Sequence, residues 1–206
     1  MRLQYRYNQF EWGMYMDILR TIKERRSTLA FKNEEIDIAT LKEIFTYGSY
    51  APTHYMSEAW RIKLYQGKGK QILVQAILNS YQRVGMLPKG DSPKAVRSRE
   101  SIGNFLLTIP HHALIYYEKP QDRIRNEEEY SSIAAFIQNC QLAAWEYDIG
   151  MLWTITPYMH DEQFIKEIGL DPDKHKISAV LQIGYPEKVT RDKGRKPVKE
   201  FLEVIE

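Results

Sequence analysis

One long segment with helical periodicity constrains the fold more than any other feature of the sequence. Between residues 127 and 147, apolar side chains recur at spacings of three and four, and acidic residues occupy the first turn, where the helix dipole favours them. This pattern predicts the longest helix of the chain and places it in the core. Its apolar positions are Ile133, Phe136, Ile137, Cys140, Ala144 and Tyr147.

Shorter helices and strands surround this segment without the regular βαβ repetition of a doubly wound fold. We therefore predict an α+β sandwich in which helices surround one sheet. The expected helices are residues 15–26, with Ile18, Leu19 and Ile22 on one face, a helix opening at Thr40, one around residues 72–77, and residues 161–168. The expected strands are residues 60–66, 113–116, 151–156 and 177–183.

Two segments carry more specific signals. Thr40 is followed three residues later by Glu43, a capping-box signature that predicts the start of a helix, and Pro52 ends that helix. The region 84–104 contains two prolines, three glycines and many charges. Because such composition favours irregular structure, we expect this region to be a mobile excursion of the kind that often covers a site.

Length and charge narrow the class of protein. At 206 residues the chain fits one domain, which we place at residues 15–206 after an extension of residues 1–14. Lys and Arg number 29 against 27 Asp and Glu, so no broad field attracts nucleic acid or an anionic membrane. The sequence has neither a long apolar run nor a signal peptide, and it has one cysteine, so we expect a cytoplasmic protein.

Several kinds of catalytic or metal site lack support in this sequence. No GxGxxG, P-loop or GxSxG motif is present, and the five histidines lack metal-ligand spacing, so no metal site is expected. His111 and His112 are neighbours in a strand-like run, so their side chains point to opposite faces and serve structural roles. Cys140 lies on the apolar face of the long helix, where a buried structural thiol is favoured over a nucleophile.

Two basic clusters are candidates for holding an anion. Arg25, Arg26 and Ser27 follow one another at the end of the first expected helix, and Lys193 and Arg195 lie in the charged tail. Arginine binds phosphate through paired, charge-assisted hydrogen bonds, so the first cluster could grip a phosphate. Local sequence alone favours the alternatives, which are helix C-terminal charge for the first cluster and a solvated tail for the second.

An ordered set of short motifs along the chain includes both basic clusters. Each motif alone is weak, whereas the ordered set is specific. The motifs are residues 24–28 with Phe31, residues 48–53, 60–62, 133–139, 142–144, 147–153, 183–186 and 193–197. In this set the sequence resembles the FMN-dependent nitroreductase family across residues 17–206.

The resemblance implies a nitroreductase-like sandwich with a mostly antiparallel central sheet, assembled as an intertwined homodimer with FMN at the interface. The first cluster would meet the phosphate and pyrimidine end of FMN, and the tail cluster would join it at the phosphate. The loop after the second helix would approach the flavin of the other subunit, and backbone groups near residues 154–157 would lie by flavin N5. The implied FMN-binding residues are Arg25, Arg26, Ser27, Pro52, Thr53, His54, Met56, Thr154, Thr156, Pro157, Lys193 and Arg195.

The sequence departs from the family pattern at three places. Met56 and Glu58 stand in a segment that is usually more polar or amide-bearing, which removes a polar contact. Thr156 and Pro157 replace a small or glycine-containing pair near N5, which leaves the backbone donor unassigned. Leu29 occupies a position that is often basic, which removes one charge near the pyrimidine ring.

The implied activity is transfer of hydride from NAD(P)H to flavin N5 and on to a nitroaromatic, a quinone or a similar small oxidant, with no catalytic side chain. A protein that stores or senses flavin with little turnover is the alternative, motivated by Met56 and Glu58. Nucleic-acid binding is disfavoured because no basic stripe with interleaved aromatic residues is present.

Overall fold

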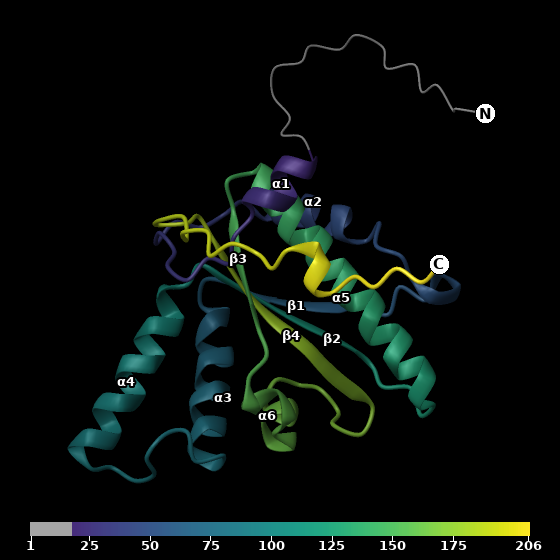
Figure 1. Cartoon of the computed structure of the whole chain (residues 1–206). Helices are drawn as coiled ribbons and strands as arrows, with labels where there is room; N and C mark the ends of the chain where they lie inside the picture. Colours follow the sequence, from purple (N-terminus) through teal and green to yellow (C-terminus); the bar gives the residue numbers. More distant parts are fainter. Residues whose placement is uncertain (1–17) are drawn as a thin grey trace.

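A computed structural model describes residues 18–206 of the chain and contains one four-stranded sheet (Figure 1). The strand order is β1-β2-β4-β3, and all neighbouring strands are antiparallel. The predicted α+β class and antiparallel sheet are therefore confirmed, while the expected extension at residues 1–14 lies outside the described residues. The strands are β1 (Arg61–Tyr65), β2 (His111–Glu118), β3 (Gly150–Thr154) and β4 (His175–Gly184).

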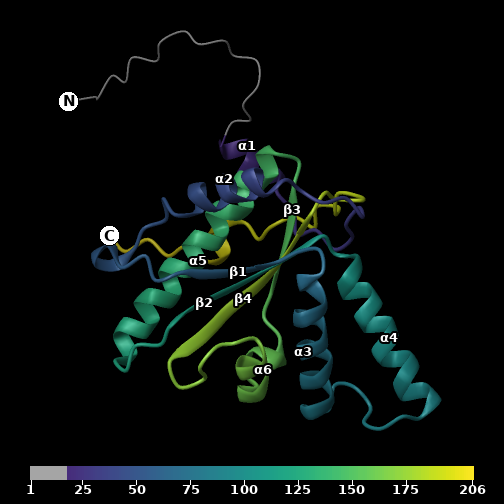
Figure 2. The ribbon, with the colours of Figure 1, turned by 180° about the vertical axis from the view of Figure 1, so that it is seen from behind.

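Helices cover both faces of this sheet, which explains why consecutive side chains of its central strands are buried, alternately on one face and on the other. On β2, Ala113 and Ile115 belong to a core cluster with α5, whereas Leu114 belongs to a second cluster with α3 and α6. Figures 1 and 2 show α1, α2 and α5 on one side of the strands and α3, α4 and α6 on the other. The helices are α1 (Ile18–Glu24), α2 (Ile38–Gly48), α3 (Gly69–Arg83), α4 (Pro93–Thr108), α5 (Arg123–Glu146) and α6 (Glu162–Glu167).

The predicted core helix is α5, which begins four residues earlier than its apolar pattern suggested. Asp122 caps it, because its side chain accepts a hydrogen bond from the Arg125 backbone N–H at 2.8 Å. Ile133 and Cys140 on its apolar face are fully buried, so the predicted core position is confirmed. No helix within residues 18–206 combines the length and apolarity needed to cross a membrane.

The predicted mobile excursion at residues 84–104 is wrong, because its second half belongs to α4. Ser92 accepts a hydrogen bond from the Ala95 backbone N–H at 3.2 Å, and Pro93 occupies the first helical position, which suits its missing N–H. Ala95 and Gly103 of α4 are buried, and Gly103 allows a close approach to α3, since a Cβ atom there would lie 3.2 Å from Leu78. The charges that suggested a loop lie on the exposed side of the helix.

The start of α2 and the surface of α1 also differ from the predictions. Thr40 lies inside α2, which begins at Ile38, so the predicted capping box is not formed. Burial of Leu41 decides the position of this helix more strongly than its capping residues. On α1 the apolar face containing Ile18 and Ile22 is exposed, at 57% and 52%, and Thr21 is buried instead.

Candidate functional site

The segment after α1 crosses the start of β3 and the end of β4, which brings it beside the segment that follows β4. We call residues 27–32 the N-terminal strap and residues 187–206 the C-terminal tail. The Thr28 backbone N–H donates to the Met151 carbonyl at 3.1 Å, and the Lys32 backbone N–H donates to the Tyr185 carbonyl at 2.8 Å. These bonds place the residues just before the strap beside the beginning of the tail.

Gly150 permits this close approach. A Cβ atom at this position would overlap the side chain of Thr28, which is itself buried. Glycine is therefore required for packing rather than for an unusual backbone angle. The glycine in the family-like motif at residues 147–153 thus fixes the strap against β3.

The two basic clusters meet at one place, which we call the cation corner and define as Arg25, Arg26, Lys193 and Arg195. Asp192 connects its two halves: its Oδ2 lies 2.9 Å from Arg26 Nη2, and its Oδ1 lies 3.8 Å from Arg195 Nη1. Lys193 is exposed in the same turn of the tail. The two clusters that the sequence motifs related to one ligand are therefore brought together in the fold.

Arg25 is the member of the cation corner with an unused donor in the interior. Its Nη1 donates to Gln141 Oε1 at 3.3 Å, whereas its Nε is buried and has no hydrogen-bond partner among residues 18–206. Burial, followed by the positive charges of Arg26 and Arg195, lowers the pKa of Arg25. A buried donor among mutually repelling cations is the environment that an anionic group such as a phosphate would complete.

Three residues that contact the cation corner or the strap beside it were missed by the sequence predictions. Gln141 is buried on α5 and holds Arg25. Thr190 Oγ1 donates to the Ser27 carbonyl at 2.9 Å and ties the tail to the strap. The sequence contains one indication of the role of Asp192. It stands two residues before Gly194, a spacing that is typical of a turn closed by an Asp side chain.

Hydrogen bonds in the segment that follows β3 show which backbone N–H group there is left to donate to a ligand. Thr154 Oγ1 donates to the Val180 carbonyl at 2.7 Å, and the Thr156 backbone N–H donates to Met159 Sδ at 3.4 Å. Pro157 has no N–H, so among the three residues that follow β3, Ile155 is the one whose N–H is left for a ligand. Ile155 lies four residues beyond the strap contact at Met151, or about 13 Å along an extended chain.

The loop at residues 52–58, which contains the short 3₁₀ helix His54–Met56, lies elsewhere on the same chain. His54 Nε2 lies 3.4 Å from Glu128 Oε2 near the start of α5, whereas Arg25 contacts Gln141 near its end. These two α5 positions are thirteen residues apart, which corresponds to about 20 Å along a helix. One chain therefore does not bring this loop to the cation corner.

This loop has an unusual backbone conformation. Tyr55, Met56 and Glu58 have φ angles of 48°, 55° and 42°, in the left-handed region that non-glycine residues seldom adopt. The side chains of Tyr55 and Met56 are 92% and 76% exposed, so they contribute little to the core of their own chain. Left-handed residues of this kind cluster where a backbone serves a ligand or a partner.

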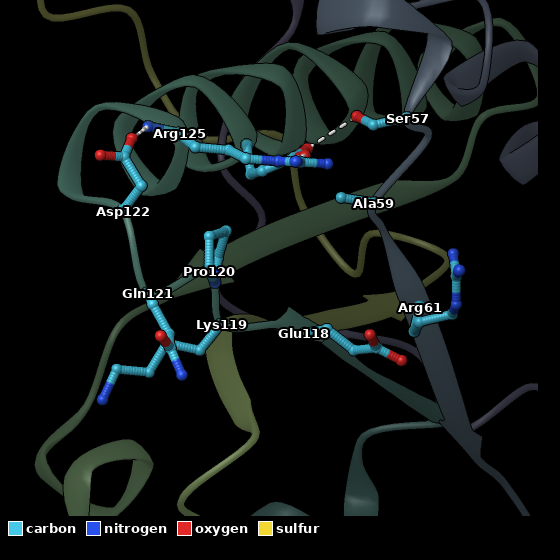
Figure 3. A pocket seen from close by; sticks show the side chains of 10 residues that line it. Ser57, Ala59, Arg61, Glu118, Lys119, Pro120, Gln121, Asp122 and Arg125 are labelled. Carbon is cyan, nitrogen blue, oxygen red and sulfur yellow. Dashed lines mark hydrogen bonds and ion pairs between the residues drawn. The ribbon is translucent and has the colours of Figure 1, made fainter.

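A polar pocket of about 430 Å³ opens beside this loop (Figure 3). Ser57 Oγ donates to Glu129 Oε2 at 2.8 Å across one wall. Figure 3 shows the side chains of Arg61 and Glu118 on the strands opposite the start of α5. The pocket adjoins the loop and not the cation corner, so its volume does not identify the anion site.

An antiparallel sheet between two helical layers, with a cation corner where strap and tail meet, defines an α+β protein with a candidate anion site. The family model described as "Nitroreductase family" matches residues 22–185, and the chain belongs to the nitroreductase family. The resemblance found in the sequence motifs is thereby confirmed.

Individual relatives agree with this assignment. The "Nitroreductase-like Family Protein" from Bacillus cereus is 32% identical, with a TM-score of 0.84, over 95% of this chain and 100% of that chain. The Bacillus subtilis (strain 168) protein named "Putative NAD(P)H nitroreductase YfhC" is 28% identical over 87% of this chain and 89% of its own length. The FMN-dependent nitroreductase NfnB from Mycobacterium smegmatis, solved in complex with NADPH, shares the fold, with a TM-score of 0.68 and 15% identity over 91% and 97% of the chains.

Proposed function

We propose that this protein is an FMN-dependent oxidoreductase that takes hydride from NAD(P)H and passes it to a small oxidant, such as a nitroaromatic or a quinone. Family membership supports the class of reaction, and the relatives described as an NAD(P)H nitroreductase and as an FMN-dependent nitroreductase with NADPH support the two cofactors. Bound FMN supplies the hydride-accepting N5 atom. The protein's own residues bind FMN, orient it and admit the second substrate.

The cation corner is the observation that carries this proposal. Arg25, Lys193 and Arg195 hold the FMN phosphate, because the buried Nε of Arg25 needs an acceptor and the cations around it need a counter-charge. The family resemblance adds Ser27 and Arg26 at the same end of FMN. Gln141 orients Arg25 from α5.

The segment after β3 provides the other end of the site. The Ile155 backbone N–H would be the donor to flavin N5, since Thr156 donates to Met159 and Pro157 has no N–H. A fixed backbone donor at this position orients the ring for hydride transfer without a general base. Thr154, Thr156 and Pro157 then shape the edge around this donor rather than supply it.

The loop at residues 52–58 completes the site of a second subunit. Pro52, Thr53, His54 and Met56 are too far from the cation corner of their own chain, so they approach the flavin of a partner. Exposed Tyr55 and Met56 on a left-handed backbone are suited to such a contact. The protein therefore functions as a homodimer with two shared FMN sites.

Other exposed apolar surfaces support the same homodimer. Ile18 and Ile22 on α1 are exposed, and the end of the tail exposes several large apolar side chains. Isolated exposed apolar residues are ordinary, but a run of them on an extended tail is suited to packing on a neighbour. The tail residues are Val198, Phe201, Leu202, Val204 and Ile205, which are 57–89% exposed.

Two measurements test the function. The purified protein should show the visible absorbance bands of bound flavin, and it should oxidise NADH or NADPH steadily with menadione or a nitrofuran. Bound FMN that stays oxidised during anaerobic incubation with both nucleotides would contradict the reductase proposal. That outcome would favour flavin storage or sensing, the alternative suggested by Met56 and Glu58 in the loop.

A further inference from the structure

Arg26 differs from Arg25 in how its guanidinium group is used. Its Nη1 donates to the Lys23 carbonyl and, at 2.9 Å, to the Arg25 carbonyl, while its Nη2 lies 2.9 Å from Asp192 Oδ2. Its side chain is only 15% exposed. Both N–H groups of Nη1 and one of Nη2 are thus bound within the protein, which leaves Arg26 poorly placed to grip a phosphate.

Asp192 lies at the centre of the turn that carries the tail cations. Its Oδ1 accepts a hydrogen bond from the Gly194 backbone N–H at 3.0 Å, and Gly194 adopts a φ of +74°, which glycine tolerates without strain. The same Oδ1 lies 3.8 Å from Arg195 Nη1. One carboxylate therefore closes the turn and faces an arginine from each end of the chain.

Few other contacts hold this turn in place. Every residue from 191 to 206 is exposed. Just before this turn, the Thr190 Oγ1 hydrogen bond to the Ser27 carbonyl connects the tail to the strap. The cations of the corner repel one another, because Arg26 and Arg195 both disfavour the charged form of Arg25. A carboxylate between the halves offsets this repulsion before any ligand arrives.

We propose that Arg26 and Asp192 form a positioning pair that holds Lys193 and Arg195 beside Arg25, and that Arg26 does not itself contact the FMN phosphate. This inference rests on the proposed FMN-dependent function. It differs from the direct FMN contact that the family resemblance implies for Arg26. It also differs from a model in which Asp192 competes with the FMN phosphate for the cations of the corner. The two models predict opposite changes in FMN affinity when Asp192 is neutralised.

The first test uses the protein without FMN and follows tryptic cleavage at Arg191, Lys193 and Arg195. Asp192→Asn keeps the acceptor for the Gly194 N–H but removes the charge, so the turn is preserved and only the ion pair is lost. A carboxylate beside the cleaved bond slows trypsin by itself, so Arg26→Met, which removes the pair without changing the cleavage sites, is the decisive variant. We expect cleavage to accelerate about fivefold in Asp192→Asn and in Arg26→Met, as the pair no longer holds the tail. Glu203→Gln, a neutralisation elsewhere in the tail, should cleave at the wild-type rate. Equal rates for Arg26→Met and wild type would overturn the positioning role.

The second test compares the affinity for FMN with the affinity for riboflavin, which lacks the phosphate. In Asp192→Asn and in Arg26→Met, FMN affinity should fall about fivefold to tenfold while riboflavin affinity stays unchanged, because only the phosphate grip is disturbed. The double variant should be no weaker than either single variant, since the two residues act as one unit. Asp192→Glu, which keeps the charge, should restore most of the FMN affinity.

The outcomes separate the competing explanations. Tighter FMN binding by Asp192→Asn would overturn the inference in favour of competition between Asp192 and the phosphate. A double variant whose loss is the sum of the single losses would mean that Arg26 touches FMN directly, which also overturns it. Failure of wild-type protein to bind FMN would contradict the proposed function instead, and the proteolysis result would still decide whether the pair holds the tail.

Discussion

Arg25 combines partial burial, a donor without an acceptor and two neighbouring cations. Replacing it by Ala should weaken FMN binding by about 1.5 to 3 kcal/mol, the usual range for a hydrogen bond to a charged group. Arg20→Ala is the matched control, because Arg20 lies in α1, which ends just before Arg25, and within residues 18–206 its side chain pairs with Glu24 on the surface, at 2.9 Å. Fluorescence titration with FMN measures both. Equal affinities for Arg25→Ala and Arg20→Ala would remove Arg25 from the phosphate grip.

The adjacent histidines of β2 have structural partners. His111 Nε2 accepts a hydrogen bond from the Ile36 backbone N–H at 2.9 Å, and His112 Nε2 lies 2.9 Å from the Leu106 carbonyl. Both side chains are 1% exposed. These contacts support the prediction that neither residue takes part in turnover. Intact FMN binding without turnover in His111→Gln or His112→Gln would contradict it.

Burial of His112 gives a prediction for stability against pH. Burial lowers the pKa of His112 to about 4, although its hydrogen bond to the Leu106 carbonyl acts in the opposite direction. The unfolded chain therefore binds more protons between about pH 6.5 and 4, so the free energy of unfolding should decrease by roughly 3 kcal/mol as pH falls through that window. Urea unfolding at several pH values measures this slope. The slope should be shallower in His112→Gln and unchanged in His160→Gln, a change at an exposed histidine; an unchanged slope in His112→Gln would show another group to be responsible.

At the scale of single residues, the sequence predicted the cations of the site but not the groups that orient them. Arg25, Lys193 and Arg195 belong to motifs, so their pattern was visible along the chain. Gln141 and Asp192 act through contacts with residues more than a hundred positions away, and no local pattern encodes such contacts. The Ile155 N–H became a candidate only after the bonds of its neighbours were known.

Helix packing offers a test at the scale of secondary-structure elements. Gly48 ends α2 against α5, where a Cβ atom would overlap Cys140 Sγ and approach Phe136 at 2.8 Å. Gly48→Ala should therefore destabilise the protein by about 1 to 3 kcal/mol through overpacking. Gly69→Ala is the control, since Gly69 in α3 has nothing within 4 Å of the added atom. Thermal unfolding compares the two; equal stability would show that α2 and α5 can separate at little cost.

The elements themselves were largely predictable because burial follows periodicity. The four predicted strands and the α5 helix are present, with ends displaced by a few residues. The signals that failed were local ones. The start of α2 is set by burial of Leu41 and not by a capping box at Thr40. The charged composition of residues 84–104 concealed α4, which packs on α3. Tertiary packing overrides local propensity in both cases.

At the scale of the whole molecule, we predict an obligate dimer whose interface exceeds about 2,000 Å², the range of obligate homodimers. The exposed apolar side chains of α1 and of the tail would be covered in such an interface. Sedimentation of the flavin-loaded protein at low micromolar concentration should therefore give a dimer, and dissociation should release FMN. A monomer that carries stoichiometric FMN would refute the shared site.

The separation of the cation corner from the loop at residues 52–58, along α5, has a genetic consequence. Assayed at FMN concentrations close to the wild-type Kd, Arg25→Ala and a chain with this loop replaced by a Gly-Ser linker should each be nearly inactive alone. In a mixed dimer one site would take its intact corner from one chain and its intact loop from the other. Co-expression of the two inactive chains should thus restore about one quarter of the active sites, because half of the random dimers are mixed and each has one intact site. Two defective alleles would then complement each other. If each active site were confined to a single chain, co-expression would restore no active site.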